Sequence, residues 1–393
     1  MQNFIFISPN FPTNYKNFCR ELKNNGLNVL GVGDTAYDNL DPELVENLTE
    51  YYKVNSLENY DEVYQAVAFF SFKYGKPDWI DSLNEYWLTM DARLRTDFNV
   101  NSGFKNEDMK RCRYKSGMKP YYKKAGIPTA RFYLVKNIEG CRKFIKEVGY
   151  PVIVKPNNGV GASDTSRLSN EEDLKAFFGR MNPTVEYIME EMIHGEICSY
   201  DAIVDAEGNP LFEAGNISPM AIIDMVNEAE TSRYFIVKDL PDDVRAAGRA
   251  ATKAFDVKSR FIHFEFFRLT EDMPSMGKKG DVVALEVNMR PSGGFTTDML
   301  NFARSTDVYK IYADMIAFNR STIREGEHFY CAYLGRRDGH DYKVSDSEIF
   351  HKYDVRLACR VPDAFADDMG NRAFLVNFRD EKDMQKFFAQ TLN

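Results

Sequence analysis

The fold is decided by the stretch Val282-Val-Ala-Leu-Glu-Val-Asn-Met-Arg-Pro-Ser-Gly-Gly-Phe295. Its apolar first half predicts a β-strand. Because strand side chains alternate between faces, Glu286, Asn288 and Arg290 should project from the same side. One carboxylate, one amide and one guanidinium on one face form a surface suited to a cation and a phosphate, and a Pro-Ser-Gly-Gly turn follows.

A second predicted strand, Arg260–Leu269, precedes this stretch and carries Glu265. An exposed loop joins the two strands, so Glu265 and Glu286 are expected to be cross-strand neighbours. Two carboxylates and an amide oxygen suit Mg²⁺ held between protein and phosphates. The alternatives are exposed strand glutamates and, for Arg290, a structural ion pair with one of them.

Further upstream, a Val/Ile-rich strand ends at Lys155 and is followed by Pro-Asn-Asn-Gly-Val-Gly-Ala-Ser163. A flexible loop of this kind can place backbone N–H groups on phosphate oxygens while the lysine meets the same anion. It differs from the common P-loop, in which the lysine follows the glycines. Taken alone, a surface strand end with a flexible turn explains the segment equally well.

The two ends of the chain predict different architectures. Strands at Phe4–Ser8 and Leu27–Val32 flank a helical segment, which favours a parallel α/β unit. Gly31 and Gly33 lack the third glycine of a dinucleotide fingerprint and are interpreted as a turn. Residues 298–318 predict one long helix, and short strands and helices alternate from Phe329 onward, which indicates an α+β unit.

The composition narrows the class of protein. A chain of 393 residues favours two to four sub-domains. A formal net charge of -9 argues against nucleic-acid binding. The sequence shows no signal peptide and no run of 18 apolar residues, so we expect a cytoplasmic protein without a membrane partner. The six cysteines are widely spaced and are expected to be buried or incidental thiols.

Taken together, the Lys155 strand and loop, Glu265 in Ile-His-Phe-Glu-Phe, and Glu286-Val-Asn-Met-Arg290 resemble the ATP-grasp superfamily. The resemblance covers about residues 75–320 and hardly touches the last 65 or so. It is nearest to stand-alone carboxylate-amine ligases of the amino-acid or dipeptide type, and to a single half of carbamoyl-phosphate synthetase.

The resemblance implies a multidomain α/β and α+β chain with the ATP-grasp fold. The expected parts are an N-terminal parallel α/β domain (1–98), an ATP-grasp domain (99–325) with a small lid at about 128–190 and a body carrying the metal site, and a C-terminal α+β subdomain (326–393).

It also implies roles for individual residues. Counting eleven residues back from Gly126 selects Lys115 for the α-phosphate, with Lys110 as the alternative. In relatives a glutamate that binds ribose stands where this chain has Ile197, so Glu196 takes that role only if the strand shifts locally. The implied ATP-binding set is Lys115, Lys155, Gly159, Gly161, Ser163, Glu190, Glu191, Met192, Ile193 and Glu196; the implied metal ligands are Glu265, Glu286 and Asn288; the implied catalytic residues are Arg290, Gly293 and Gly294.

The activity implied by the resemblance is ATP-dependent ligation of a small-molecule carboxylate to an amine through an acyl phosphate, with release of ADP and phosphate. The implied cofactors are ATP and one or two Mg²⁺ ions, with Mn²⁺ as a substitute, and the resemblance allows a homodimer. The alternatives are a kinase of the same fold, a carboxylase-like enzyme, and a nucleotide-binding regulatory protein without turnover.

Overall fold

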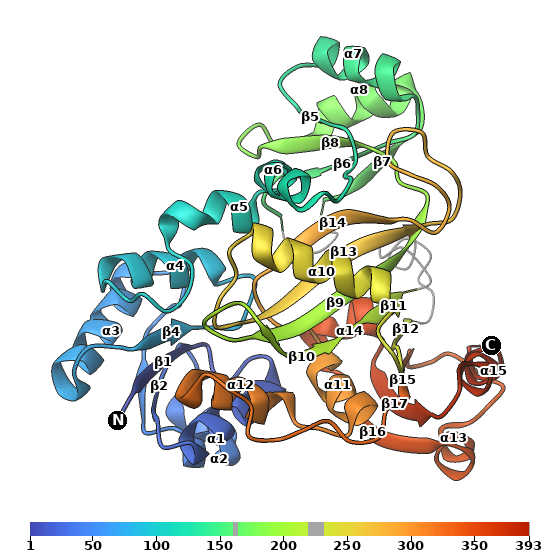
Figure 1. Ribbon diagram of the computed structural model, residues 1–393. Helices are drawn as coiled ribbons and strands as arrows, with labels where there is room; N and C mark the ends of the chain where they lie inside the picture. Colours follow the sequence, from blue (N-terminus) through green and yellow to red (C-terminus); the bar gives the residue numbers. More distant parts are fainter. Residues whose placement is uncertain (160–163, 219–231, 393) are drawn as a thin grey trace.

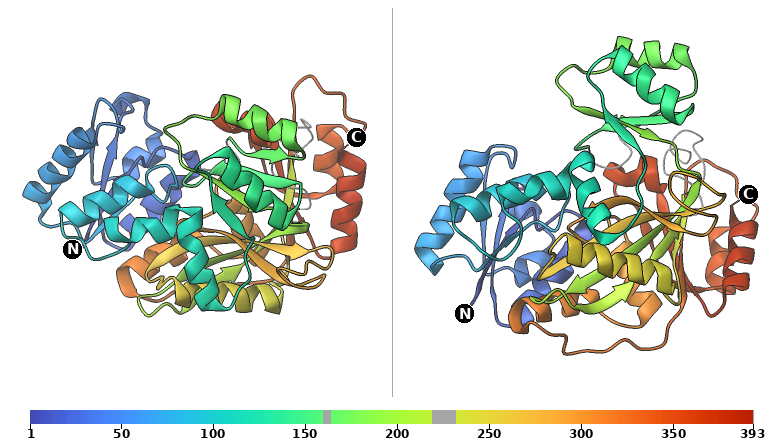
Figure 2. Two further views of the ribbon diagram at one scale, coloured as in Figure 1. Left: turned by 90° about the horizontal axis from the view of Figure 1, so that it is seen from above. Right: turned by 45° about the horizontal axis from the view of Figure 1, so that its top comes forward.

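The computed structural model describes residues 1–159, 164–218 and 232–392, and these residues form three sheets. The body lies in the centre, a lid rises above it, and the N-terminal unit and the C-terminal strands lie on opposite sides of the body (Figures 1 and 2). The mixed α/β and α+β class expected from the sequence is confirmed. The domain boundaries stay a prediction.

The N-terminal unit is a parallel four-stranded sheet in the order β3-β2-β1-β4. Every residue of β1 is buried, because helices cover the sheet and leave no solvent-facing side. Asp41 and Asn59 cap α2 and α3 by accepting backbone N–H groups. The elements are β1 (Asn3–Ile7), η1 (Thr13–Tyr15), α1 (Lys16–Asn24), β2 (Asn28–Gly33), η2 (Tyr37–Asn39), α2 (Pro42–Asn47), β3 (Glu50–Lys53), α3 (Tyr60–Tyr74), β4 (Trp79–Asp81) and α4 (Leu88–Asp97).

The lid is an antiparallel sheet in the order β5-β8-β6-β7. Two helices cover it, and Phe144 and Phe177 pack with strand residues such as Val154 in one core. The lid consists of β5 (Phe132–Leu134), α7 (Ile138–Val148), β6 (Val152–Pro156), β7 (Ser166–Leu168), α8 (Glu171–Arg180) and β8 (Tyr187–Glu191), and a connecting segment before it contains η3 (Asn106–Asp108), α5 (Met109–Arg113) and α6 (Lys115–Ala125).

The body is a nine-stranded antiparallel sheet in the order β14-β13-β9-β11-β12-β15-β17-β16, with β10 paired to β9. The C-terminal strands join this sheet through the pairing of β12 with β15. Its elements are β9 (Gly195–Val204), β10 (Pro210–Ala214), β11 (Asn216–Ser218), β12 (Arg233–Ile236), α10 (Asp242–Ala254), β13 (Arg260–Leu269), β14 (Val282–Asn288), α11 (Thr296–Arg304), α12 (Val308–Phe318), β15 (Tyr330–Arg336), α13 (Asp346–Lys352), β16 (Asp354–Arg360), α14 (Asp363–Met369), β17 (Arg372–Phe378) and α15 (Glu381–Thr391).

The single long helix expected over 298–318 is wrong, because the structure has two helices, α11 and α12. Ser305 adopts a left-handed conformation with φ 44°, which ends α11. Asp307 then caps α12 by accepting the N–H groups of Tyr309 and Lys310. The continuous apolar pattern concealed this break.

Two smaller expectations can also be compared with the structure. The cysteines are free thiols, and five of them are buried, as expected. Among the described residues, no helix has the length and hydropathy needed to cross a membrane.

A buried ion cluster joins the N-terminal unit to the body. The Asp81 carboxylate lies 3.2 Å from Nη2 of Arg95 and 2.7 Å from Nη1 of Arg260. All three side chains are almost fully buried. Arg260 also donates to the backbone carbonyl of Met289, next to the end of β14. One carboxylate therefore holds two arginines from different parts of the chain.

We expect Asp81→Asn to destabilise the protein by about 3–5 kcal/mol, because it leaves two buried guanidinium groups without their carboxylate. Urea unfolding of the variant and the wild type measures the difference. Asp34→Asn, an equivalent change at an exposed residue of the same unit, serves as the control. A loss for Asp81→Asn no larger than that of the control would contradict the structural role given to the cluster.

Candidate active site

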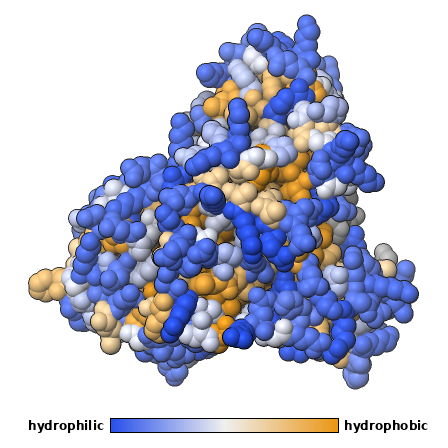
Figure 3. Space-filling model, in the orientation of Figure 1, coloured by the Kyte–Doolittle hydropathy of each residue, from blue (hydrophilic) through white to orange (hydrophobic). Residues whose placement is uncertain are grey.

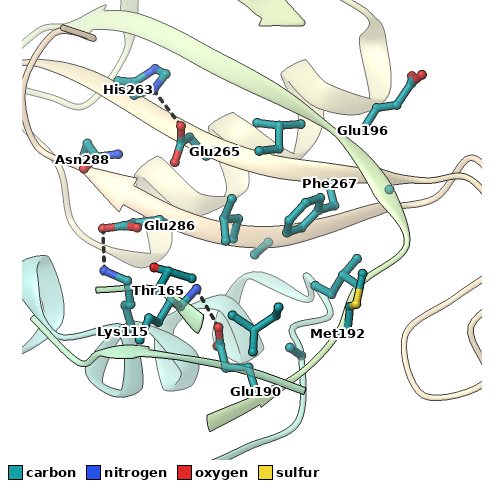
Figure 4. Close-up of a pocket in the computed structure, with 18 of the residues that line it drawn as sticks. Lys115, Thr165, Glu190, Met192, Glu196, His263, Glu265, Phe267, Glu286 and Asn288 are labelled. Carbon is teal, nitrogen blue, oxygen red and sulfur yellow. Dashed lines mark hydrogen bonds and ion pairs between the residues drawn. The ribbon is translucent and has the colours of Figure 1, made fainter. Parts of the chain in front are cut away.

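A cavity of about 660 Å³ lies between the lid and the body. Its walls come from lid strands β6 and β8, body strands β9, β13 and β14, and helix α6 (Figure 4). The face of the molecule seen in Figure 3 is mostly hydrophilic, and hydrophobic residues are visible on it between the lid and the body. The cavity brings together residues that are far apart in the sequence.

Strands β13 and β14 form the floor of the cavity. Glu265 on β13 lies directly opposite Glu286 on β14, and His263 lies opposite Asn288. The register shifts by one residue immediately after Glu265, so Leu285 is an extra residue on β14. A bulge of this kind redirects side chains. Past the bulge, the residues of the two strands that line the cavity are apolar: Phe267, Ala284 and Leu285.

Ion pairs surround the two carboxylates. Lys115 lies 3.2 Å from Glu286, and His263 lies 3.4 Å from Glu265 (Figure 4). His263 also lies 2.8 Å from Asp201. Burial raises the pKa of Glu286, and Lys115 opposes this rise. Burial also opposes ionisation of Glu265, but the contact with His263 outweighs it and lowers the pKa of this carboxyl. Glu265 is therefore ionised at neutral pH.

The donor set fits a hard divalent cation of the Mg²⁺ type. The carboxylates of Glu265 and Glu286 and the amide oxygen of Asn288 are hard oxygen donors on one face of two paired strands. No group of three or more His, Cys, Asp or Glu side chains in the described ranges is arranged around a metal position. The protein can thus supply part of a coordination shell, and the rest would come from phosphate oxygens or water, as is usual for Mg²⁺.

The lid contributes Lys155 and Glu190, and helix α6 before it contributes Lys119. Lys155 on β6 lies 2.7 Å from Glu190 on β8, and Lys119 on α6 forms a second ion pair with the same carboxylate. Burial would raise the pKa of Glu190, but the two ammonium groups outweigh it and lower the pKa to about 2. Lys119 was not among the site residues predicted from the sequence. Its spacing of four residues from Lys115, which places both on one helix face, was the signal that could have found it.

The depressed pKa of Glu190 predicts a pH effect on stability. Its usual pKa is 4.5, so the stabilisation is complete above that pH and is lost as the pH falls toward 2. Between pH 6 and pH 3 the wild type should lose on the order of 2 kcal/mol more than Glu190→Gln, which cannot titrate. Urea unfolding at both pH values measures this difference. Equal losses in the two proteins would show that Glu190 keeps an ordinary pKa.

At the hinge between the lid and the body, the adjacent residues Glu190 and Glu191 have different partners. Glu190 faces the two lysines, whereas Glu191 is held by Arg131 at 2.7 Å and by the Ser275 hydroxyl at 2.9 Å. Of these two acids, Glu190 is the one that forms an ion pair with a lysine predicted to bind ATP, Lys155. Met192 and Ile193 follow in the cavity wall, and further apolar residues complete this end: Ala130, Ile153, Ile197, Phe267 and Leu285.

Strand β9 places Glu196 and Ile197 on opposite faces. Ile197 is buried in the cavity wall, whereas Glu196 is exposed at its edge. Glu196 shares its strand face with Cys198 and Tyr200, which belong to the core beneath α10. Its side chain points away from Glu265 (Figure 4). No local shift brings Glu196 to the position of Ile197.

Of the remaining predicted residues, Arg290 and Gly293 line the far end of the cavity, and Gly294 follows directly in the chain. The guanidinium of Arg290 donates to the carbonyl of Pro291 at 2.8 Å. Gly293 lines the cavity, and Gly294 adopts a left-handed conformation with φ 61°. The carbonyl of Gly159 accepts from Lys115 at 3.1 Å. Lys110 is exposed and does not line the cavity. Gly161 and Ser163, predicted to bind phosphate, lie outside the described residues.

Comparison with known proteins shows what this chain resembles. The family model of the carbamoyl-phosphate synthase L chain, ATP binding domain, matches residues 115–234. D-alanine–D-alanine ligase B of Clostridium perfringens is 29% identical over 211 residues, which are 52% of this chain and 67% of that protein. The L-arginine-specific L-amino acid ligase of Bacillus subtilis is 27% identical over 239 residues, which are 58% of this chain and 55% of that protein.

The similarity extends to the whole fold. The crystal structure of the L-amino acid ligase from Bacillus licheniformis superposes with a TM-score of 0.71 at 14% identity, and the match covers 99% of this chain and 96% of that chain. The chain has the ATP-grasp fold, and the resemblance to ATP-grasp ligases is confirmed. The chain spans about half the length of the arginine-specific relative that it matches.

Proposed function

We propose that this ATP-grasp chain is an ATP-dependent carboxylate-amine ligase that forms an amide bond through an acyl phosphate. The observation that carries the proposal is the facing of Glu265 and Glu286 across paired strands, with Lys115 and the lid lysine Lys155 lining the same cavity. Such a site concentrates positive charge and oxygen ligands around a polyphosphate, and phosphoryl transfer depends mainly on positioning and charge neutralisation.

The cavity has an apolar end and a charged end, and ATP would lie along this axis. The base would occupy the apolar end between Ile153 and Phe267, next to the backbone of Met192 and Ile193. The phosphates would extend toward Lys115 and the other lysines. Since Glu196 points away from the cavity's charged end, we propose that ribose is held without this carboxylate.

Glu265, Glu286 and Asn288 would hold Mg²⁺ with the phosphates. When bound, the ion would neutralise charge on the transferring phosphoryl group. Lys115 already pairs with Glu286, and it would keep a positive charge next to the same phosphates. His263, whose pKa burial lowers but Asp201 raises more strongly, to about 9, would hold Glu265 in its ionised form.

Bond formation would occur near Arg290 and the glycine turn. An oxygen of the carboxylate substrate attacks the γ-phosphorus, and ADP leaves. Arg290 would stabilise the charge of the resulting acyl phosphate. The amine then attacks the acyl carbon, phosphate leaves, and the amine loses a proton. Backbone N–H groups near Gly293 and Gly294 would donate to the oxyanion that forms in this step.

A screen of amino-acid and small-acid pairs with Mg-ATP tests the proposal. We expect release of ADP and phosphate that requires both a carboxylate and an amine, with a new amide detected by mass spectrometry. AMP and pyrophosphate as products would contradict the acyl-phosphate route. A stable phosphate ester formed without an amine would indicate a kinase. Thermal stabilisation by Mg-ATP with no ADP under any substrate mixture would indicate a regulatory protein.

A further inference from the structure

Glu85 belongs to the N-terminal unit but lines the cavity between the lid and the body. It follows β4 in the turn that leads to α4, about 200 residues before Arg290 in the sequence. Its side chain is nearly buried, with the residue 8% exposed. A carboxylate in such a position requires charged partners.

Two arginines supply those partners. The Nε of Arg290 lies 3.3 Å from one Glu85 oxygen, and Nη1 of Arg113 lies 3.2 Å from the other. Arg113 also donates to the backbone carbonyl of Glu85. Because one carboxylate lies between two guanidinium groups, the cluster keeps a net positive charge. Glu85 can therefore orient Arg290 without cancelling the charge that a phosphoryl group would meet.

The turn that carries Glu85 is held in place by hydrogen bonds. Leu83 adopts φ 54° and donates its N–H to Asp81 at 3.0 Å, and its carbonyl accepts the Tyr15 hydroxyl at 2.6 Å. The Ser82 hydroxyl accepts the N–H of Asn84 at 3.1 Å. Asp81 belongs to the buried ion cluster described above. The carboxylate thus extends from a fixed backbone, as a positioning residue requires.

The other contacts of Arg290 restrain it less. Its Nη1 bonds the carbonyl of the adjacent Pro291, and its Nη2 is 3.5 Å from the Asn288 amide oxygen. Both partners lie within two residues of Arg290, so these contacts link the guanidinium to its own segment, the end of β14 and the turn that follows. Among the interactions recorded for the described residues, Glu85 is the charged partner that ties the guanidinium to a different part of the fold.

We propose that Glu85 is a positioning residue that fixes the guanidinium of Arg290 at the reaction centre, so that the N-terminal unit forms part of the active site. The proposal rests on the function proposed above for Arg290. Glu85 contacts neither of the lysines that would bind ATP. Its loss should therefore slow the chemical step and leave ATP binding unchanged.

The test compares Glu85→Gln with wild type in amide formation, using a substrate pair found in the screen. We expect kcat to fall by about 10- to 100-fold, the usual cost of removing a group that orients a reacting residue, with an unchanged KM for ATP. Glu85→Asp, which keeps the charge on a shorter side chain, should recover part of the rate. Glu46→Gln, at an exposed glutamate of the same unit, should match wild type.

A double-mutant cycle asks whether Glu85 acts through Arg290. If it does, the Glu85→Gln/Arg290→Ala variant will be no slower than Arg290→Ala alone. Additive losses, or an unchanged kcat in Glu85→Gln, would overturn the inference. If Glu85→Gln fails to fold by thermal melting, Glu85→Asp decides, and a kcat equal to wild type or a loss confined to the KM for ATP would overturn it. A wild type without ligation would instead refute the proposed function.

Discussion

The Glu286→Gln variant is expected to lose about 10²- to 10³-fold in kcat for amide formation, the range seen when one preorganised electrostatic group is removed. Glu286 faces Glu265 across paired strands and lies 3.2 Å from Lys115. Replacing its carboxylate with an amide removes one of two anionic oxygen ligands and leaves the Lys115 ammonium without its counter-charge. Both changes weaken the site that would hold Mg²⁺ and the phosphates.

The measurement is ADP release and amide formation at saturating ATP over a range of Mg²⁺ concentrations. The variant should need more Mg²⁺ and remain slow at saturation. Glu271→Gln makes the same chemical change at an exposed residue just after β13 and should match wild type. Ligation by Glu286→Gln within about tenfold of wild type would place the metal site elsewhere.

Local sequence patterns predicted much of the body and the lid. Alternation along β14 predicted Glu286 and Asn288 on one face, and the short connection predicted Glu265 as the cross-strand neighbour of Glu286, which the strand pairing confirms. The count back from Gly126 selected Lys115, which reaches the cavity. The strand prediction was correct because strand alternation and short loops depend on residues close together in the sequence, whereas Lys115 was selected from the family resemblance and its contact with the α-phosphate stays a prediction.

Contacts between distant segments could not be predicted in the same way. Lys119 meets Glu190 across 71 residues, and Glu85 meets Arg290 across 205. Simple alternation of side chains along the strands predicts a regular register. It therefore did not predict the register shift that makes Leu285 an extra residue. These features depend on how the N-terminal unit, the lid and the body pack against one another. The periodicity of a single sequence does not reveal that packing.

The Lys155→Ala variant is expected to raise the KM for ATP by about 10- to 150-fold, which corresponds to the loss of one charged hydrogen bond to phosphate. Burial lowers the pKa of Lys155, but Glu190 outweighs it and raises the pKa, so the side chain stays protonated at neutral pH. In the variant Glu190 still pairs with Lys119, and the lid should therefore fold normally.

ATP-dependent turnover at varied ATP concentration measures the effect, with thermal melting to confirm folding. Lys143→Ala, at an exposed lysine of α7 on the same lid, should leave the KM unchanged. An unchanged KM and kcat in Lys155→Ala would remove the lid lysine from the nucleotide site. A raised KM together with a wild-type melting temperature would show that Lys155 acts in phosphate binding and is not needed for stability. Lys119 alone would then be sufficient to pair with the buried Glu190 carboxylate.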